Sequence, residues 1–526
     1  MIDHLFSLFS NRARWPGLLL MLMTVLPLTA CGRAPQTPSA PVAAQPSASR
    51  TATDAPAPAA TLTPTPTLPP TSTSTTTALP TLTPTPTPGP TVSPDIAAVP
   101  AVVRQGDFLS TIAARYRVSL DALISYNAIE NPNAVAVGQR LMIPYQTNRF
   151  TPDQTLLPDS ELVYGPAYLD FDVAAFVAQQ DGWLAHYAKP WFDGQTLSGA
   201  QLVDYVAMRY SVGPRVLLAM LEARSGWVTN PEEPQAQERD FPMGHLANGG
   251  GLEVQLEWAA AALNSGFYGW MERGETGVRF RDYSIARGAP GLNPGTIAIQ
   301  RTLAQDTTFS GLPAELDAFM DAYHRLFGDP FQYDQGRILP RGLQQPSLAF
   351  PWEPGEWWYL TGGPHGAWGA GSSWAALDFV PQDAPIGACA PAQTWARAAA
   401  SGLVVRNNRG ELLEDLDGDG DMRTGWVLQY LHIADRPPAG THLQIGDPIG
   451  RPSCEGGRAA SSHLHIARRY NGVWVAAGGP IPLQLDGWTA FAGNSAYAGG
   501  MIGPQGQKIT ACDCREENIN GILIGK

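Results

Sequence analysis

The feature that most constrains this fold is a long tract near the N-terminus, built almost only from proline, threonine, alanine and serine. It runs from Arg33 to about Pro94 and contains repeats such as Thr63-Pro64-Thr65-Pro66. Because the tract has too few apolar side chains to form a core, we expect a disordered, partly polyproline-II spacer. Fully extended at about 3.1 Å per residue, it would reach on the order of 200 Å. The folded domains are therefore expected after it.

An export signal is predicted ahead of this spacer, over residues 1–31. Two arginines precede an apolar run, Leu18 to Leu28, that is too short to span a bilayer as a mature helix. Leu28-Thr29-Ala30-Cys31 then resembles a bacterial lipobox, which implies that Cys31 becomes the lipidated N-terminus. An ordinary signal peptide with an incidental cysteine is the alternative. Residues 32–98 would then be the linker between the membrane and the folded part.

Length and charge narrow the remaining possibilities. The chain has 526 residues, which is too long for a single hydrophobic core. Two to four domains are therefore expected. Its formal net charge is −13. Nucleic-acid partners need basic patches, so this composition argues against them. It also gives no support for binding to an anionic membrane surface.

A small α+β module is predicted over residues 99–145, reading as strand, helix, helix and strand. Gly106-Asp107 marks its first turn, Asn131-Pro132 begins a later loop, and the segment Gly138 to Pro144 closes it. In this order the motifs resemble the LysM family, whose members bind glycans that contain N-acetylglucosamine. The resemblance implies sugar contacts from Gly106, Asp107, Asn131 and Pro132. A structural module without a ligand is the alternative.

A linker (146–169) and a mostly helical domain (170–335) should follow. The segment from Tyr210 to Trp227 resembles the lysozyme-like transglycosylases, which place a catalytic glutamate directly before a Ser-Gly pair. Here Arg224 holds that position, and Glu222 lies two residues earlier, about 200° round a helix. We therefore predict a degenerate, non-catalytic domain. A muramidase site at Glu222 is the alternative.

Histidines concentrate in the C-terminal third, where five of the nine fall between residues 365 and 465. In His463-Leu464-His465 the two imidazoles are two residues apart, so in a strand they point to the same face. Asp378 lies in a short apolar strand, where a buried carboxylate needs a partner such as a metal ion. A His/Asp/His set with an open fourth position suits catalytic zinc. Zinc in such a site polarises a carbonyl and lowers the pKa of water.

Together these motifs resemble the M23 metalloendopeptidases, most closely their beta-lytic branch. The match rests on four motifs in order: Gly362-Gly363-Pro364-His365, Leu377-Asp378-Phe379, Tyr430-Leu431-His432 and His463-Leu464-His465. By that resemblance one zinc is held by His365, Asp378 and His465. The same resemblance makes His432 and His463 the catalytic pair that orients water and stabilises the oxyanion. It also implies a mostly antiparallel β-domain with a narrow groove. We place that domain at residues 345–495, with 496–526 as a C-terminal tail.

An acidic run, Asp415 to Asp421, precedes the Tyr430 strand and is reminiscent of a calcium loop. An EF-hand needs an acid at its twelfth position, and neither possible start of the motif provides one. A solvated hairpin tip is slightly favoured, and bound Ca²⁺ is the alternative.

The four cysteines beyond Cys31 permit three pairings. We favour Cys389 with Cys454, because both lie in the proposed catalytic domain. A bridge between Cys512 and Cys514 would be strained, so these two are expected to stay reduced or to pair otherwise.

The function expected from the sequence is that of a secreted, lipid-anchored zinc metalloendopeptidase, facing the cell wall, that hydrolyses stem peptides or cross-bridges of peptidoglycan. The glycan-binding module would hold the enzyme on its polymer and raise the effective substrate concentration. One alternative is a non-catalytic scaffold that regulates other wall hydrolases, although degenerate relatives lose metal-binding residues and all five motif residues are present here. Another is a secreted protease for glycine-rich proteins.

Overall fold

The predicted export signal, Cys31 and the spacer lie outside the part of the chain that the structure describes. The computed structural model describes residues 96–191, 194–247, 249–369 and 371–525. Within these ranges no helix combines the length and apolar character that crossing a membrane requires.

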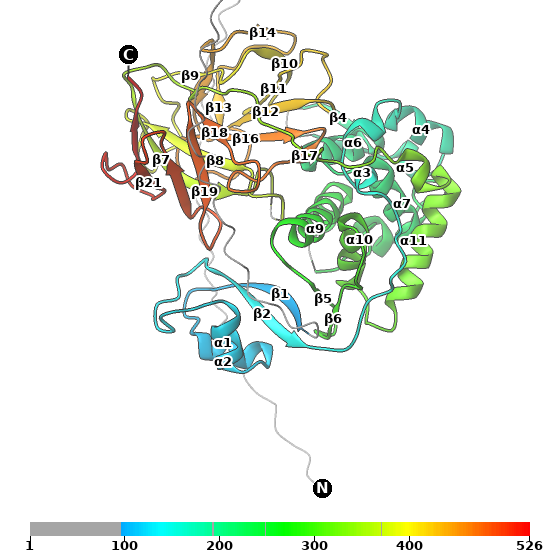
Figure 1. The fold of residues 1–526 in the computed structure, drawn as a ribbon. Coiled ribbons are helices and arrows are strands. Elements are labelled where there is room, and N and C mark those ends of the chain that lie inside the picture. The colour runs from blue at the N-terminus through cyan, green and yellow to red at the C-terminus, as the bar shows by residue number, and fades with distance from the viewer. Residues whose placement is uncertain (1–95, 192–193, 248, 370, 526) are drawn as a thin grey trace, which may run out of the picture. The chain divides into compact units, whose positions relative to one another are not determined.

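The first folded module is a two-stranded antiparallel ribbon with two helices (Figure 1). Its elements are β1 (Ile96–Val102), α1 (Leu109–Tyr116), α2 (Leu120–Tyr126) and β2 (Arg140–Gln146). Val99 pairs with Ile143 in the ribbon, and Ile112 and Leu123 from the helices are buried in the same small core. The order is the strand, helix, helix and strand that the sequence predicts.

The middle region is mostly helical. Its longer helices are α4 (Val173–Gln180), α6 (Gly199–Tyr210), α7 (Pro214–Ser225), α9 (Leu252–Glu272), α10 (Pro294–Ala304) and α11 (Leu312–Phe327). Its shorter elements are α3 (Asp159–Leu162), α5 (Trp183–His186), α8 (Ala236–Asp240), β3 (Ala188–Pro190), β4 (Thr196–Ser198), β5 (Gly277–Arg279), β6 (Ile285–Arg287), and two 3₁₀ turns at Pro166–Tyr168 and Pro330–Tyr333.

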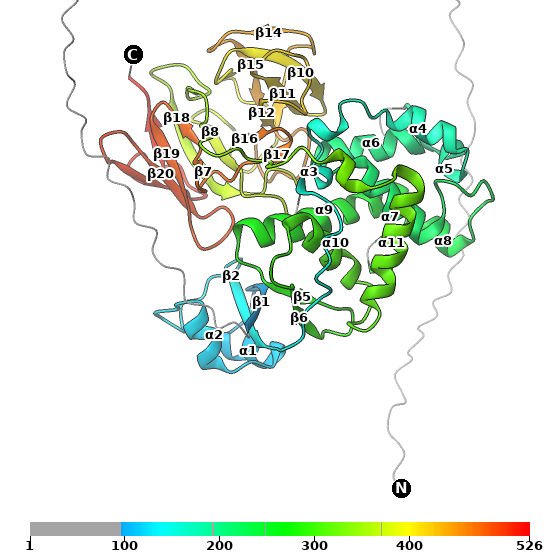
Figure 2. The same cartoon turned by 45° about the vertical axis from the view of Figure 1, so that its right-hand side comes forward.

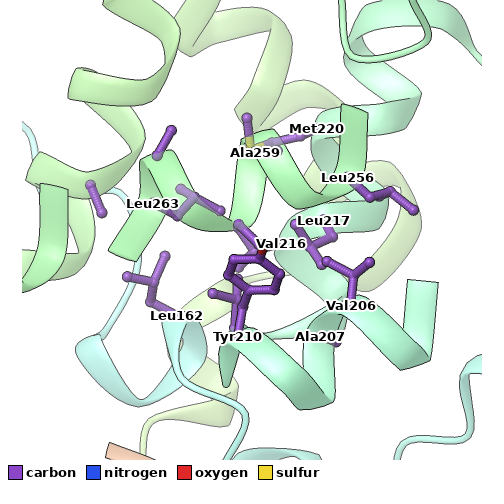
Figure 3. Close-up of a cluster of buried hydrophobic side chains, with 14 of the residues drawn as sticks. Leu162, Val206, Ala207, Tyr210, Val216, Leu217, Met220, Leu256, Ala259 and Leu263 are labelled. Atoms are coloured by element: carbon purple, nitrogen blue, oxygen red, sulfur yellow. The ribbon is translucent and has the colours of Figure 1, made fainter. Parts of the chain in front are cut away.

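Helix α7 is the most deeply buried part of this region: its residues 214–222 are all buried, and residues 216–221 form an unbroken apolar run. Pro214 occupies its first turn, and Gly226 ends it in the left-handed conformation, with φ +68°. Val216 and Leu217 of α7 gather with side chains of α6 and α9 in one buried cluster (Figure 3). In Figure 2 the long helix α9 is seen beside α10, against which it packs.

The C-terminal region is built on one antiparallel sheet. Its strands include β7 (Trp357–His365), β8 (Ala376–Pro381), β10 (Gly402–Asn408), β11 (Glu411–Asp415), β12 (Trp426–Leu431), β14 (His442–Leu443), β16 (Leu464–Tyr470), β17 (Val473–Trp474) and β22 (Gly521–Leu523). The order is β14-β10-β11-β12-β16-β8-β7-β22, with β17 beside β16. The smaller strands β9 (Ala396–Arg397), β13 (Ile433–Ala434) and β15 (Pro448–Pro452) form a separate sheet.

Residues 496–526 were expected to be a tail, but the described part of this segment, residues 496–525, belongs to the β region. They contribute β20 (Gly499–Ile502), β21 (Lys508–Thr510) and β22, and β22 pairs with β7 at the sheet edge. The preceding strands β18 (Gln484–Leu485) and β19 (Trp488–Ala492) join β20 and β21 in a four-stranded sheet. The strands β20, β21 and β22 are only three or four residues long, so their sequence carries little β-pattern, and tertiary pairing decides their structure.

Among the described residues two disulfides are formed, Cys389–Cys454 and Cys512–Cys514. The first is the favoured pairing, whereas the second contradicts the expectation for Cys512 and Cys514. A bend in the chain explains the difference, because the buried amide of Asn520 donates to the carbonyl oxygens of both cysteines and holds their Cα atoms 5.2 Å apart.

The core of the helical region continues into the β region. Val473 and Trp474 of β17 and Ala467 of β16 belong to the same buried cluster as α7 and α9. Buried hydrogen bonds join the two regions as well: Tyr268 accepts from the Trp474 amide at 3.0 Å, and Ser211 donates to the Gly472 carbonyl at 2.6 Å. We conclude that one edge of the β region packs into the core of the helical region, while the β region also has a buried cluster of its own.

A buried acid in the β region predicts how stability changes with pH. Glu414 is fully buried, and burial raises the pKa of its carboxyl group to about 8, although the Tyr430 hydroxyl donates to it at 2.8 Å. Since the folded state binds this proton more tightly, its contribution to stability should decline as pH rises from about 4.5 to about 8. In Glu414→Gln this decline is absent.

We therefore expect the free energy of unfolding of Glu414→Gln, relative to the wild type, to increase by on the order of 3 kcal/mol between pH 5 and pH 8. Urea denaturation of the full chain at both pH values measures the difference. Glu233→Gln, at an exposed carboxylate, is the matched control. Parallel stability curves for Glu414→Gln and the wild type would contradict the prediction.

Candidate metal centre

Three residues proposed from sequence as metal ligands come together at the ends of neighbouring strands. His365 ends β7, Asp378 lies in β8 and His465 lies in β16, where it is paired directly with Asp378. His365 Nε2 is 3.1 Å from His465 Nδ1 and 3.3 Å from Asp378 Oδ1, and His465 Nδ1 is 3.1 Å from the same oxygen. All three residues are buried.

This triangle has the size that tetrahedral zinc requires. Zinc bonds to imidazole nitrogen and carboxylate oxygen are about 2.0–2.1 Å long, which places neighbouring ligand atoms about 3.3 Å apart. The three separations of 3.1–3.3 Å match that edge. Two neutral imidazoles and one carboxylate are also donors that zinc accepts.

Backbone carbonyl groups set the tautomer of each imidazole. His365 Nδ1 faces the Gly363 carbonyl at 2.9 Å, and His465 Nε2 faces the Ala367 carbonyl at 3.2 Å. A carbonyl only accepts, so the nitrogen that faces it carries the proton, and the other nitrogen keeps a lone pair. In both histidines that lone pair points into the triangle, as expected for oriented metal ligands.

His432 and His463 stand beside the triangle, with ring centroids 4.5 Å apart. Their Nδ1 atoms face the carbonyls of Glu455 and Ser461, at 2.9 and 2.8 Å, so each Nε2 is free to accept. His463 Nε2 is 3.7 Å from Asp378 Oδ1. Burial, together with the two neighbouring histidines, lowers the pKa of His432 to about 3, which keeps this imidazole neutral at physiological pH.

Asp378 is ionised in these surroundings. Burial alone would raise the pKa of its carboxyl group, but His365, His463 and His465 lower that pKa well below its usual range. The site therefore presents one negative charge inside a ring of imidazoles, which is the electrostatic environment that a divalent cation needs.

Glycine at position 362 is required by the close approach of β7 to Asp378. A Cβ atom at Gly362 would lie 2.6 Å from Asp378 Oδ2. The register of β7 against β8 also shifts on both sides of Gly362, which turns the end of the strand so that His365 reaches the site. The glycine pair before His365, noted only as a motif in the sequence, thus has a steric role.

Tyr497 is a site residue that sequence analysis missed. Its ring stacks on His365, with centroids 4.1 Å apart and planes 18° apart, and it is 57% exposed. Backbone hydrogen bonds to Gly363 and Pro364 hold it there. The residue lies in the segment assigned to a tail, and a lone tyrosine carries no sequence signal. Only the pairing of the C-terminal strands with β7 brings it to the site.

Glu222, the alternative muramidase residue, has a carboxylate that is already engaged in hydrogen bonds within the fold. Its carboxylate accepts from the backbone N–H groups of Val228 and Thr229, at 3.1 and 3.2 Å, and from the Thr229 hydroxyl at 2.6 Å. It therefore binds the turn after α7, and we expect no catalytic role for it.

The residues proposed for glycan contact lie on the two predicted loops. Gly106 adopts φ +85°, and the carboxylate of Asp107 is bound to the Arg104 amide and to Arg115. Asn131, before Pro132, accepts from the Asn133 amide at 3.1 Å. Asp107 and Asn131 thus shape their loops as well.

The acidic run does bring carboxylates together. Asp415, Asp417 and Asp419 lie close enough for each to offer an oxygen to one ion, but the last two are exposed. Their oxygens accept from backbone amides of the same loop, at Asp417, Asp419, Gly420 and Asp421. Hydrogen bonds of this kind are typical of a hairpin tip whose carboxylates bind the backbone of their own loop.

Comparisons with known proteins agree with this layout. Residues 101–144 match the family model of the LysM domain, and residues 155–340 match the model described as "LasA, N-terminal domain". The matching family of the middle region is thus the LasA N-terminal domain, whereas the sequence suggested a lysozyme-like one. Over 343 residues the chain is 24% identical to Protease LasA of Pseudomonas aeruginosa strain UCBPP-PA14, which covers 61% of this chain and 75% of the relative. The figures for Protease LasA of strain PAO1 are the same.

Two solved structures are also similar. The M23 metalloprotease pseudoalterin, from the deep sea, is 24% identical over 32% of this chain and 96% of its own, with a TM-score of 0.27. The catalytic domain of the antimicrobial peptidase lysostaphin from Staphylococcus simulans is 21% identical over 23% of this chain and 87% of its own, with a TM-score of 0.17.

Proposed function

We propose that this chain, an M23 family peptidase with a LysM domain, is a metalloendopeptidase that hydrolyses peptide bonds of peptidoglycan with one zinc ion. The observation that carries the proposal is the triangle of His365, Asp378 and His465, whose donor atoms have the spacing of tetrahedral zinc ligands. Similarity to a protease over 75% of that protein's length supports it.

His365, Asp378 and His465 would hold the ion, and a zinc ion with three protein ligands would keep a position for water or substrate. Zinc held there supplies a Lewis acid that polarises the scissile carbonyl and lowers the pKa of water. Gly363 and Ala367 orient the two imidazoles through their carbonyl groups, so the ligands are pre-arranged before metal enters.

His432 and His463 move the proton. Each has an unprotonated Nε2, because its Nδ1 is committed to a carbonyl. We assign to this pair the task of accepting a proton from the attacking water. The imidazolium so formed donates a hydrogen bond to the oxyanion of the tetrahedral adduct, and its proton passes to the leaving amine as the carbon–nitrogen bond breaks. Tyr497, stacked on His365 and half exposed, lies where it can contact the bound peptide.

The LysM domain and the lipidated N-terminus keep the enzyme close to its substrate. We propose that the loops around Gly106-Asp107 and Asn131-Pro132 bind the N-acetylglucosamine glycan, and that Cys31 carries a lipid that anchors the protein to the membrane, facing the cell wall. For the Asp415–Asp421 loop we propose no resident Ca²⁺, since its carboxylates are bound to their own backbone.

Metal removal tests the reaction class. Digestion of purified peptidoglycan by the full chain should release new amino groups and no new reducing sugar ends. A zinc chelator should abolish that release, and stoichiometric Zn²⁺ should restore it, because the ion supplies the polarising charge. Reducing ends that appear with or without chelator would instead indicate a glycosidase, and an intact substrate under all conditions would indicate a scaffold.

A further inference from the structure

The loop that joins β7 to β8 contacts both the metal centre and the helical region. Residues 366–369 and 371–375 of this loop are described. At its start, the Ala367 carbonyl accepts from His465 Nε2 at 3.2 Å. The Ala367 amide donates to the Ser373 carbonyl at 3.1 Å, which closes the loop on itself. The position of Ala367, and with it the ring of His465, therefore depends on where Ser373 is held.

The C-terminal end of helix α9 holds that part of the loop. Ser373, which is fully buried, donates through its hydroxyl to Glu272 Oε1 at 2.8 Å. The guanidinium of Arg273 donates to the carbonyls of Gly371 and Ser372, each at 3.3 Å, and its side chain is only 11% exposed. Arg273 is itself fixed by Glu275 at 3.0 Å.

Close packing between loop and helices makes this contact specific. A Cβ atom at Gly371 would lie 2.7 Å from the Ala261 carbonyl of α9. Earlier in the loop, the Trp368 ring is 4.1 Å from the Arg209 guanidinium of α6. The loop thus contacts two helices of the helical region, and the tight contact at Gly371 leaves little room for another arrangement.

We propose that Glu272 and Arg273 are positioning residues of the metal centre. The hydrogen-bond chain runs from Glu272 to Ser373, from Ser373 to Ala367, and from Ala367 to His465. It fixes the imidazole so that Nδ1 faces the ion. The helical region is then part of the metal site as well as a neighbour of it. This inference rests on the proposed function, because it gives His465 the role of a ligand.

Cobalt substitution of the full chain tests the proposal without relying on catalysis. Groups that orient a metal ligand typically contribute about 10–100-fold to metal affinity. We expect the double variant Glu272→Ala/Arg273→Ala to lose Co²⁺ to a chelator about 10-fold faster than the wild type and to show an altered visible cobalt spectrum. Glu272→Gln, whose amide oxygen still accepts from Ser373, should behave as the wild type does.

Glu253→Ala is the matched control, because it removes an acid from the other end of α9, where Glu253 pairs with Lys189. If the double variant gives the spectrum and chelator half-time of Glu253→Ala, the positioning role is refuted. If Glu272/Arg273 variants do not fold, a wild-type spectrum and half-time for Ser373→Ala refutes it equally. A wild-type chain that binds no Co²⁺ would refute the proposed function itself, so the two failures are distinguishable.

Discussion

Replacing His465 by alanine is expected to remove both the metal and the peptidase activity. The variant keeps only His365 and Asp378, and two ligands from one edge of the triangle cannot enclose a tetrahedral ion. Since a group that only orients a ligand contributes about 10–100-fold to affinity, loss of the ligand itself should cost more than about 100-fold. Zinc analysis of the purified protein and release of amino groups from peptidoglycan measure the two effects.

His442→Ala provides the control for this variant. His442 is an exposed histidine on β14, outside the metal centre, so its replacement should change neither zinc content nor digestion. Digestion that persists in metal-free His465→Ala would move the activity to the helical region, and zinc retained at one equivalent would show that His465 is not a ligand.

Sequence reasoning reached the candidate site because the strand period is short and regular. His463 and His465 share a face through the alternation of side chains in β16, and Asp378 is a carboxylate within an apolar strand that needs a partner. Both arguments concern neighbours in the chain. The family resemblance alone predicted that His365 and Asp378 lie close to these histidines. The order of strands in a sheet cannot be inferred from the local sequence pattern.

The roles that sequence reasoning missed are those of backbone groups and of residues brought to the site by distant strand pairing. Ala367 and Gly363 orient imidazoles with carbonyl groups, which every residue type possesses. Tyr497 reaches His365 because the C-terminal strands fold back onto β7, and those strands are too short to show a period. The contact of α9 with the β7–β8 loop is equally invisible, because it depends on how two regions pack.

The helical region also contains a buried ion pair that the sequence pattern does not predict. Glu161 and Arg215 are at most 2% exposed, and the guanidinium donates to the carboxylate at 2.7 and 2.8 Å. The hydroxyls of Tyr168 and Tyr323 donate to the same carboxylate, at 2.8 and 2.5 Å. One acid thereby joins α3, α7, α11 and the turn before α4.

Breaking this pair is expected to destabilise the whole chain. Glu161→Gln keeps the shape of the side chain but leaves the buried charge of Arg215 uncompensated, which typically costs about 3–5 kcal/mol. Glu253→Gln, which breaks the partly exposed pair with Lys189, should cost less than about 1 kcal/mol. Thermal and urea unfolding of the two variants measure the difference.

Glu161→Gln also tests whether the packing of α7 against β17 makes the helical region and the β region unfold together. Trp474 of the β region lies in the same buried cluster as α7, which carries Arg215. If the two regions are one cooperative unit, Glu161→Gln should release bound zinc at the temperature at which its helices melt. Zinc release and helix loss, followed together by a chromophoric chelator and circular dichroism, should therefore coincide and shift downward together. Helices that melt while zinc stays bound would show that the β region folds alone.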